Sequence, residues 1–241
     1  YKITREQQDE YALESHNRAI AAQDKNAFTK EIIPIKVAQR SLIDGEQGTQ
    51  MGQKIHIEEK IITEDEGPRR GSSIDVLSSL RTVFAKNGSV TAATSSQVSD
   101  GAGALLLASE KFVKKHNLNP LAKFSGFSVA GVPPEIMGIG PVKAIPKVLK
   151  QSNINLDDIG WIELNEAFAA QTLAVINELG LDKEKVNPLG GAIALGHPLG
   201  ATGAIRSATL LHNMKKKKIR YGMTTMCVGV GMGAAGIFEL V

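Results

Sequence analysis

Small and apolar side chains recur at helical spacing in the first part of the chain, up to about residue 26. The residues that share one face of this predicted helix are Tyr11, Ala12, Ser15, Ala19 and Ala22. Thr4 followed by Gln7 predicts an N-cap with a capping-box partner, because each side chain can satisfy a backbone N–H at the helix start. The pattern therefore predicts a helix that begins just after Thr4.

The next stretch changes from apolar to polar. The segment EIIPIKV, residues 31–37, predicts a short strand, in which Pro34 excludes a central position because proline cannot donate to a ladder. Residues 38–72 are charged, polar and interrupted by glycine, and they predict a long loop outside the core. Long loops in compact domains more often carry function than not.

Strands and helices are predicted to alternate from residue 89 onward. Residues 89–116 predict a strand, a serine-rich turn and an apolar element that runs into a helix. Residues 121–132 predict a strand, and residues 141–154 predict a helix with Pro141 in its first turn. Residues 158–180 predict a short strand, a polar turn and a long helix ended by Gly180. This alternation predicts an α/β layered fold.

The last part of the chain ends in a predicted hairpin. Residues 186–218 predict an extended piece, a glycine-rich loop and a helix that ends in four lysines, where cations suit the helix dipole. Residues 221–230 and 234–241 predict two strands around GMG. The sequences NEAF, GHPLG and MCVGVG each fall where a strand meets a turn, which is where ligands gather in open α/β sheets.

Composition narrows the class of protein. Hydrophobic residues make up 42% of the 241 residues and charged residues 22%, which excludes a disordered chain. The net charge of +3 gives no argument for a nucleic-acid partner. No apolar stretch reaches the ~20 residues of a membrane span. A single cysteine excludes an internal disulfide and a cysteine-built zinc site and fits a reducing compartment, so we expect a cytoplasmic protein with no metal, although the chain does not begin with Met.

The single cysteine, Cys227, stands in TTMCVGVGMGAAG. A lone cysteine in a strand is often an inert buried residue. Here Gly229, Gly231 and Gly233 leave the backbone bare, so a ligand can approach closely and N–H groups can donate to it. A thiol beside such donors suits acyl chemistry or proton transfer.

Two further motifs carry candidate chemistry. His197 stands in GGAIALGHPLGATG, where glycines flank it and Pro198 restrains the chain, and this control over an imidazole favours catalysis over a structural role. Asn165 and Glu166 follow a predicted strand in ELNEAFAAQ. Asn165 is equally well interpreted as a helix N-cap or as an amide that holds a water or an oxyanion. The glycine-rich loop lacks GxxxxGK[ST] and GxGxxG spacing, which excludes a nucleotide-hydrolysing protein.

Taken in order, NEAF, GGAIALGHPLGATGA and CVGVGMG strongly resemble the thiolase family of 3-ketoacyl-CoA thiolases and acetyl-CoA acetyltransferases. Upstream, TAATSSQVSDGAGALLL resembles the strand and turn of that family that meets coenzyme A, and DEGPRRGSS resembles part of its loop domain. The resemblance covers essentially the whole chain. It implies a layered αβαβα fold, with residues 1–88 as loop-domain remainder, 89–120 as the end of the N-terminal core half and 121–241 as the C-terminal domain.

The resemblance implies acyl transfer through a covalent thioester. Cys227 would be the acid/base cysteine, and His197 would activate the nucleophile and bind the thioester oxygen. Asn165 would hold the water that completes this oxyanion hole, and the N–H of Gly229 would serve a second one. An imidazole beside a thiol can lower the pKa of the thiol. Coenzyme A would be a substrate and no cofactor would be bound permanently.

Two residues match coenzyme A positions of the family less specifically. Ser96 matches a position near the pantetheine and Arg69 one near the nucleotide, although a turn-capping serine and a solvated arginine are the simpler interpretations. AAT at 92–94 stands where the family more commonly has AGN, which weakens the inference of coenzyme A binding. Ile205 stands where relatives often carry an arginine after GATGA. The wording SSQVSDGAG favours the degradative, broad chain-length branch, and thus fatty acid β-oxidation.

The main departure from the family is the nucleophile, because the family carries a second cysteine in its N-terminal half and this sequence has only one. We therefore predict no thiolysis by this chain alone, and uncovered sheet edges and apolar surface where that half would pack. The expected substrates are acyl-CoA and CoA. The expected protein partner is either a second copy of the intact protein, in a homo-dimer or homo-tetramer, or a missing N-terminal half. A non-catalytic CoA or lipid binder remains the alternative. A condensing enzyme of the ketoacyl synthase type would carry two histidines, or a histidine and an asparagine, in place of the CVG cysteine motif.

Overall fold

The computed structural model describes residues 1–43 and 54–241. Its centre is a four-stranded sheet in the order β3 (Ala122–Gly131), β6 (Met232–Leu240), β5 (Tyr221–Val228) and β4 (Ile159–Leu164). Strand β6 is antiparallel to both neighbours, whereas β4 and β5 are parallel. The carboxyl ends of β4 and β5 therefore lie at the same edge, and NEAF and the cysteine motif are brought together there.

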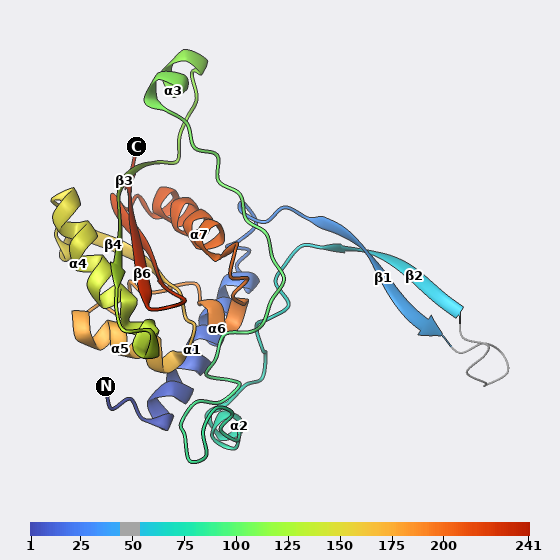
Figure 1. Cartoon of the computed structure of the whole chain (residues 1–241). Coiled ribbons are helices and arrows are strands. Elements are labelled where there is room, and N and C mark those ends of the chain that lie inside the picture. The colour runs from blue at the N-terminus through green and yellow to red at the C-terminus, as the bar shows by residue number, and fades with distance from the viewer. Residues whose placement is uncertain (44–53) are drawn as a thin grey trace.

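Helices cover both faces of this sheet (Figure 1). Helices α4 (Gly140–Ser152) and α5 (Ala169–Leu179) cover one face and α7 (Thr202–Lys217) covers the other. Successive residues of a strand point to opposite faces. Accordingly, Ile162 and Leu164 of β4 pack in the core under α4 and α5, whereas Trp161 packs with Leu210 and Met214 of α7. The predicted α/β layering is thus present.

Local sequence signals place the ends of these elements. Pro141 lies in the first turn of α4, and α5 ends at Gly180, which has a φ of 61° in the left-handed region. The predicted hairpin forms between β5 and β6, and Gly231 at its turn has a φ of 87°. The predicted strand at 121–132 is confirmed as β3, and the four lysines at the end of α7 are exposed.

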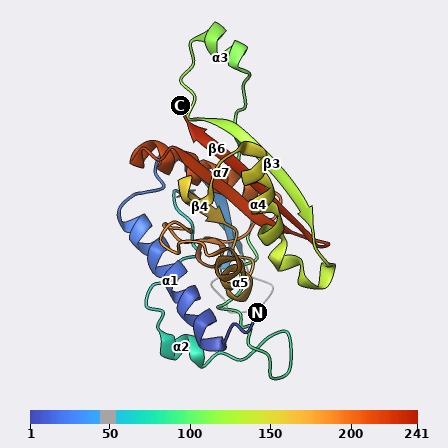
Figure 2. The same cartoon turned by 90° about the vertical axis from the view of Figure 1, so that its left-hand side faces the viewer.

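The N-terminal helix α1 (Arg5–Asp24) packs against the C-terminal part of the chain. Thr4 and Gln7 form the predicted capping box. Ala12, Ala19 and Ala22 are buried on the predicted face, and the helix contacts α2 (Ile74–Ser78), α5 and α6 (Ala192–Leu195). Figure 2 shows α1 beside α2. Small side chains on this face allow the glycine-rich loop to approach closely, since a Cβ at Gly190 would lie 2.8 Å from Cβ of Ala19.

Residues 35–43 and 54–62 form a two-stranded arm that projects from the body (Figure 1). Strand β1 (Ile35–Ile43) pairs antiparallel with β2 (Lys54–Ile62), and β1 begins directly after Pro34, where a strand was predicted. The prediction of a loop over 38–72 was therefore wrong for these strands; residues 44–53 lie outside the described residues. Apolar residues alternate with polar ones in KIHIEEKII, which is the strand signal that the many charges obscured.

The predicted strand near residue 89 is not formed. Between 89 and 109 the described structure has only isolated bridges, Thr82 with Thr91 and Ser95 with Phe168. Val98, Leu106 and Leu107 are 107%, 93% and 76% exposed. A strand forms only beside a neighbour, and the described chain places none there. The segment runs on to the short helix α3 (Glu110–His116), which stands away from the body in Figures 1 and 2.

Two short 3₁₀ helices, η2 (Pro134–Ile139) and η3 (Leu156–Asp158), directly precede α4 and β4. Across residues 1–43 and 54–241, no helix has both the length and the apolar character needed to cross a bilayer.

Candidate active site

Asn165 follows β4 directly and is fully buried. Its backbone N–H donates to the carbonyl of Thr225 at 2.9 Å, which continues the parallel pairing of β4 with β5. The N-cap of α5 is Phe168, so the interpretation of Asn165 as a helix cap was wrong. Instead, Nδ2 of its side chain lies 3.2 Å from Nε2 of His197. Two of the three motifs are therefore in direct contact.

His197 lies in the loop between α6 and α7 and is half-buried. Gly196 before it has a φ of 92°, and a Cβ there would lie 2.2 Å from Oγ of Ser99, so the loop conformation requires glycine. Nδ1 of the imidazole lies 2.7 Å from Oγ1 of Thr202, in the first turn of α7. Both ring nitrogens are thus held by buried side chains.

The electrostatic surroundings keep the His197 ring neutral. Burial lowers the pKa of His197, and the positive charge of Arg206 lowers it further. At neutral pH the imidazole therefore has one nitrogen with a free lone pair. Such a ring can accept a proton or, once protonated there, donate a hydrogen bond to an oxygen.

Cys227 lies near the carboxyl end of β5, two residues after Thr225, and pairs with Gly233 of β6. Its side chain is buried, and this burial raises the pKa of the thiol. This direction is opposite to the lowering that an imidazole beside a thiol can cause. A thiol that keeps its proton at neutral pH suits an acid rather than a nucleophile.

The structure places the other three candidate site residues, Gly229, Ser96 and Arg69, in different positions relative to the sheet edge that carries Asn165 and Cys227. Gly229 is in the exposed turn after β5, where a Cβ would meet no atom within 4 Å. The backbone N–H of Ser96 donates to the carbonyl of Ala167, one residue past Glu166, at 3.0 Å. Arg69 is exposed, and its backbone N–H donates to Nδ1 of His16 at 3.1 Å. Ser96 therefore adjoins NEAF, whereas Arg69 lies beside α1.

An open cavity of about 470 Å³ adjoins the loop that carries His197. It is lined by residues 99–103 of the exposed segment and residues 198–201 of the loop. The backbone N–H of His197 donates to the carbonyl of Gln97 at 3.4 Å, and Nε2 of Gln97 donates to the carbonyl of Ala194 at 3.0 Å. The segment is therefore anchored to the loop at Gln97, just before it becomes exposed.

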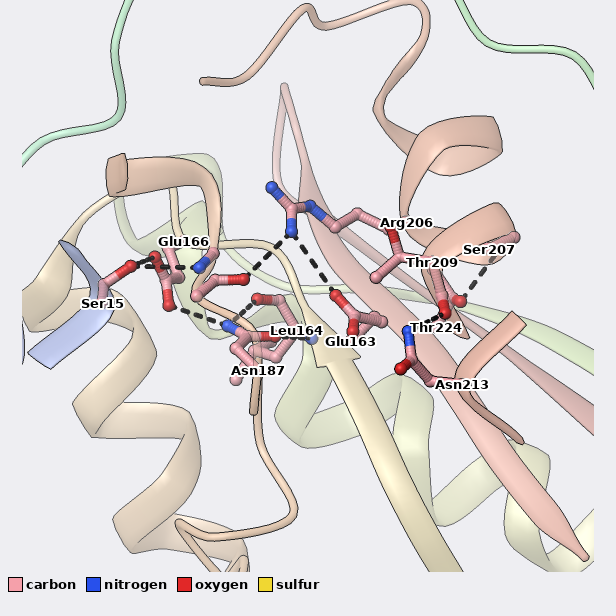
Figure 3. Close-up of polar contacts among 12 residues, drawn as sticks. Ser15, Glu163, Leu164, Glu166, Asn187, Arg206, Ser207, Thr209, Asn213 and Thr224 are labelled. Atoms are coloured by element: carbon pink, nitrogen blue, oxygen red, sulfur yellow. Dashed lines mark hydrogen bonds and ion pairs between the residues drawn. The ribbon is translucent and has the colours of Figure 1, made fainter. Parts of the chain in front are cut away.

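Glu166, which the sequence placed beside Asn165 without a separate role, is the centre of a buried network (Figure 3). Its carboxylate accepts from Oη of Tyr11, Oγ of Ser15 and Nδ2 of Asn187, each at 2.8 Å, and from the N–H of Ile193 at 3.1 Å. Its donors come from α1, α6 and the turn before α6. Because neighbouring Asn165 touches His197, this network fixes the backbone on which the site is built.

Gly191 explains one of the glycines that the sequence marked. A Cβ at Gly191 would lie 2.0–2.3 Å from the carboxyl atoms of Glu166. The backbone must therefore be bare at this position. The sequence gives little signal for this contact. Glu166 is an acidic residue among mostly apolar ones, but the groups that donate hydrogen bonds to it are far from it along the chain.

A second buried acidic group lies on the other side of β4 (Figure 3). Glu163 accepts from Nε1 of Trp161 at 2.6 Å, and Nη1 of Arg206 lies 3.5 Å from its other oxygen. Burial raises the pKa of Glu163 to about 7. Arg206 also donates to the carbonyl of Gly190 at 3.3 Å, so α7 is tied to the glycine-rich loop.

Comparison with known proteins agrees with this architecture. The model of the thiolase C-terminal domain matches residues 118–240, and that of the thiolase N-terminal domain matches residues 1–111. The chain therefore belongs to the thiolase family.

Two curated relatives are close in sequence. A 3-ketoacyl-CoA thiolase of Bacillus subtilis is 49% identical over 100% of this chain and 60% of its own length. A peroxisomal 3-ketoacyl-CoA thiolase of Saccharomyces cerevisiae is 47% identical over 99% of this chain and 52% of its own length. The chain thus spans between half and two thirds of these relatives.

Solved structures show the same fold. An acetyl-CoA acetyltransferase of Bacillus anthracis has a TM-score of 0.91 at 43% identity, covering 100% of this chain and 57% of its own. A human mitochondrial 3-ketoacyl-CoA thiolase in complex with CoA has a TM-score of 0.89 at 42% identity, covering 100% and 56%. The dimeric peroxisomal thiolase of S. cerevisiae has a TM-score of 0.86 at 45% identity, covering 100% and 56%. The fold is the layered thiolase fold.

Proposed function

We propose that this chain supplies the acid/base cysteine and the oxyanion-binding histidine of a 3-ketoacyl-CoA thiolase. The observation that supports this most is the 3.2 Å contact between Asn165 and His197, made where Asn165 is hydrogen-bonded to Thr225 of the cysteine strand. Amide, imidazole and thiol then belong to one edge of the sheet. This set can accept a proton, donate a proton and stabilise an oxyanion.

In the proposed reaction, a cysteine thiolate attacks the 3-keto carbon and the bond between the α and β carbons breaks. The acyl group stays on that cysteine as a thioester, and acetyl-CoA leaves as an enolate that takes a proton from the thiol of Cys227. The thiol of free CoA then gives its proton to the Cys227 thiolate, and its sulfur attacks the thioester and releases the shortened acyl-CoA. The nucleophilic cysteine leaves as a thiolate and regains its proton from His197. His197 takes the proton of the nucleophilic thiol in the first step. In reverse, the same groups carry out a Claisen condensation.

The binding roles belong to the same proposal. Asn165 holds a water that completes the oxyanion hole of His197, and the N–H of Gly229 serves the second hole. The exposed turn at Gly229 leaves room for a thioester oxygen to approach. Ser96 meets the pantetheine and Arg69 the nucleotide of CoA, which is a substrate and not a permanent cofactor; a related human thiolase is known in complex with CoA.

The nucleophile comes from a polypeptide region outside these 241 residues. The sequence has one cysteine, and it lies in the position proposed for the acid. Exposed Val98, Leu106 and Leu107 continue from the segment that lines the cavity beside His197. A region equivalent to the unmatched part of the B. subtilis relative would cover this surface. In the intact protein we propose a homo-oligomer, since a related yeast thiolase is dimeric.

The domain division and compartment are also proposals. Residues 1–88 form the loop-domain remainder, residues 89–120 the end of the N-terminal core half and residues 121–241 the C-terminal domain. The failure of residues 89–109 to pair as a strand, in contrast to the complete sheet that follows, supports a division in this region. We propose a reducing compartment, which keeps Cys227 as a thiol.

Complementation tests the function. The chain is co-expressed with the part of the B. subtilis thiolase that it does not match, and acetyl-CoA release from a 3-ketoacyl-CoA and CoA is measured. We expect turnover from the complex, none from either part alone, and a loss of at least roughly 10²-fold for Cys227→Ser, the size typical of removing an acid/base group. Full activity of Cys227→Ser in a soluble complex contradicts the assigned role.

A non-catalytic CoA or lipid binder is the alternative, and the single cysteine favours it. Titration calorimetry with CoA and with a non-hydrolysable acyl-CoA analogue separates the two functions in the same complex. Binding without turnover supports the binder, whereas binding with turnover supports the thiolase.

A further inference from the structure

We propose that Thr202 is a positioning residue that holds His197 in the tautomer with its proton on Nδ1, so that Nε2 presents its lone pair to the site. Only the role of this tautomer in proton transfer rests on the proposed function. The hydrogen-bond pattern and its test are independent of any acyl transfer.

The contact at Nε2 requires an acceptor there. The amide nitrogen of Asn165 can only donate, and it lies 3.2 Å from Nε2 of His197. The carbonyl oxygen of the same amide is buried, with no hydrogen-bond partner in the described part of the chain. An amide nitrogen beside Nε2 therefore places the proton of a neutral ring on Nδ1.

The contact at Nδ1 requires the same tautomer. The hydroxyl of Thr202 has one proton, and it donates to the carbonyl of Pro198 at 3.0 Å. Its oxygen, 2.7 Å from Nδ1, is then left to accept from the Nδ1–H of the ring. Two independent side chains, one at each ring nitrogen, thus specify one tautomer.

The position of Thr202 makes this arrangement rigid. Thr202 is only 1% exposed, and its backbone N–H also donates to the carbonyl of Pro198, at 2.9 Å. When Nε2 takes up a proton, the Nδ1–H to Thr202 bond stays in place, so no hydrogen has to rearrange during proton transfer. Burial and Arg206 lower the pKa of His197, which leaves the ring neutral and the tautomer decisive near neutral pH.

The test is the ¹⁵N spectrum of the histidine rings in the full chain at pH 8. Long-range correlations between ring protons and nitrogens distinguish protonated from bare nitrogens, and His197→Asn identifies the signals of this ring. We expect a protonated Nδ1 and a bare Nε2 in the wild type. A wild-type ring protonated on Nε2 overturns the proposal, whatever the variants do.

Two substitutions separate positioning from packing. Thr202→Ser keeps the hydroxyl and should preserve the Nδ1–H tautomer, whereas isosteric Thr202→Val should move the Nδ1 signal toward that of a bare nitrogen as both tautomers become populated. An unchanged His197 spectrum in Thr202→Val, or loss of the tautomer in Thr202→Ser, contradicts the proposal. If Thr202→Val does not fold, Thr202→Ala replaces it under the same criteria.

The chain offers a matched control. Thr172 is fully buried in α5 and donates to the carbonyl of Phe168, four residues earlier, at 3.0 Å, as Thr202 does to Pro198. Thr172→Val therefore removes the same kind of buried bond without touching His197. Its His197 spectrum should equal that of the wild type, and an equal change in both valine variants would assign the effect to helix packing and overturn the role of Thr202.

Discussion

The surroundings of Glu166 and the exposed segment from Val98 to Leu107 both adjoin the site but differ in how they are completed. Glu166 is 1% exposed, and each of its oxygens has two donors from this chain. The segment has apolar side chains open to solvent and no strand beside it in the described structure. The hydrogen bonds of Glu166 are all made within this chain, whereas the exposed apolar side chains of the segment have no partner to pack against in the described structure.

The difference indicates that one region stabilises the fold of this chain, whereas the proposed activity also requires the surface at the other region to be covered. Buried polar networks stabilise a fold only when every member has a partner, and around Glu166 this condition is met within the chain. Neighbouring exposed apolar side chains are typical of a surface that another polypeptide region covers. The residues of the proposed site are therefore positioned by contacts within this chain. The exposed segment beside them is the surface that we propose another polypeptide region covers.

Glu166→Gln should have the largest effect on stability. The amide NH₂ would face two of the four donors, and two buried donors left without an acceptor cost about 2 kcal/mol each, or about 4 kcal/mol in total. Urea denaturation followed by circular dichroism measures this change. Exposed Glu10→Gln in α1 is the control, and it should alter the free energy of unfolding by less than about 0.5 kcal/mol. Equal stabilities for both variants would show that the network is dispensable.

A pair of leucine substitutions compares the two regions directly. Leu164 is fully buried in the core and Leu106 is 93% exposed. Leu164→Ala should lower the free energy of unfolding by about 3 kcal/mol, through lost transfer energy and a cavity, and Leu106→Ala by less than about 0.5 kcal/mol. A comparable loss for Leu106→Ala in the same denaturation assay would mean that the segment is packed in solution.

Glu31 sharpens the comparison because one oxygen of its carboxylate, Oε2, is buried and has no hydrogen-bond partner in the described part of the chain. It accepts from Oγ1 of Thr209 at 2.9 Å, and burial raises its pKa to about 7 from 4.5. The folded state then binds more protons than the unfolded state between these values, so stability falls as the pH rises from about 4.5 to about 7. Glu31→Gln should flatten this fall by about 1–3 kcal/mol.

The measurement is denaturation at pH 5 and pH 8. Glu163, with a pKa also raised to about 7, keeps part of the pH dependence in the variant. Exposed Glu178→Gln should retain the full dependence. A Glu31→Gln variant that loses stability between pH 5 and pH 8 as steeply as the wild type does would contradict the assignment.

The smallest effect on stability is expected from charges on the exposed segment. Leu106→Asp with Leu107→Asp should leave the free energy of unfolding of the chain within about 0.5 kcal/mol of wild type, because both side chains already face solvent. Binding of a hydrophobic fluorescent dye should fall, and complementation should be lost. Undiminished complementation by this double variant would show that the partner region docks elsewhere.

Much of the local structure could be predicted from residues that act on their neighbours. Thr4 and Gln7 cap α1, Gly180 ends α5 and the glycines around Val230 make the hairpin turn, since each acts within a few residues. The arm was missed because its alternation is diluted by charge. The strand near residue 89 was predicted from composition alone, but strand formation depends on a neighbouring strand.

The candidate site was predicted in part. The order and wording of three motifs indicated Asn165, His197 and Cys227, and the contact between the first two is present. The network of Glu166 could not be predicted, because Ser15 and Glu166 are 151 residues apart and no local pattern links them.

The sequence alone indicated which residues are candidates for the proposed chemistry and where most helices and strands begin and end, because caps, turns and side-chain alternation act over a few residues. Only the tertiary structure decided that His197 lies between Asn165 and Thr202, why Gly191 must be bare and why burial raises the pKa of Cys227. These properties depend on burial and on partners far away in the chain, and such contacts exist only once the layers have packed.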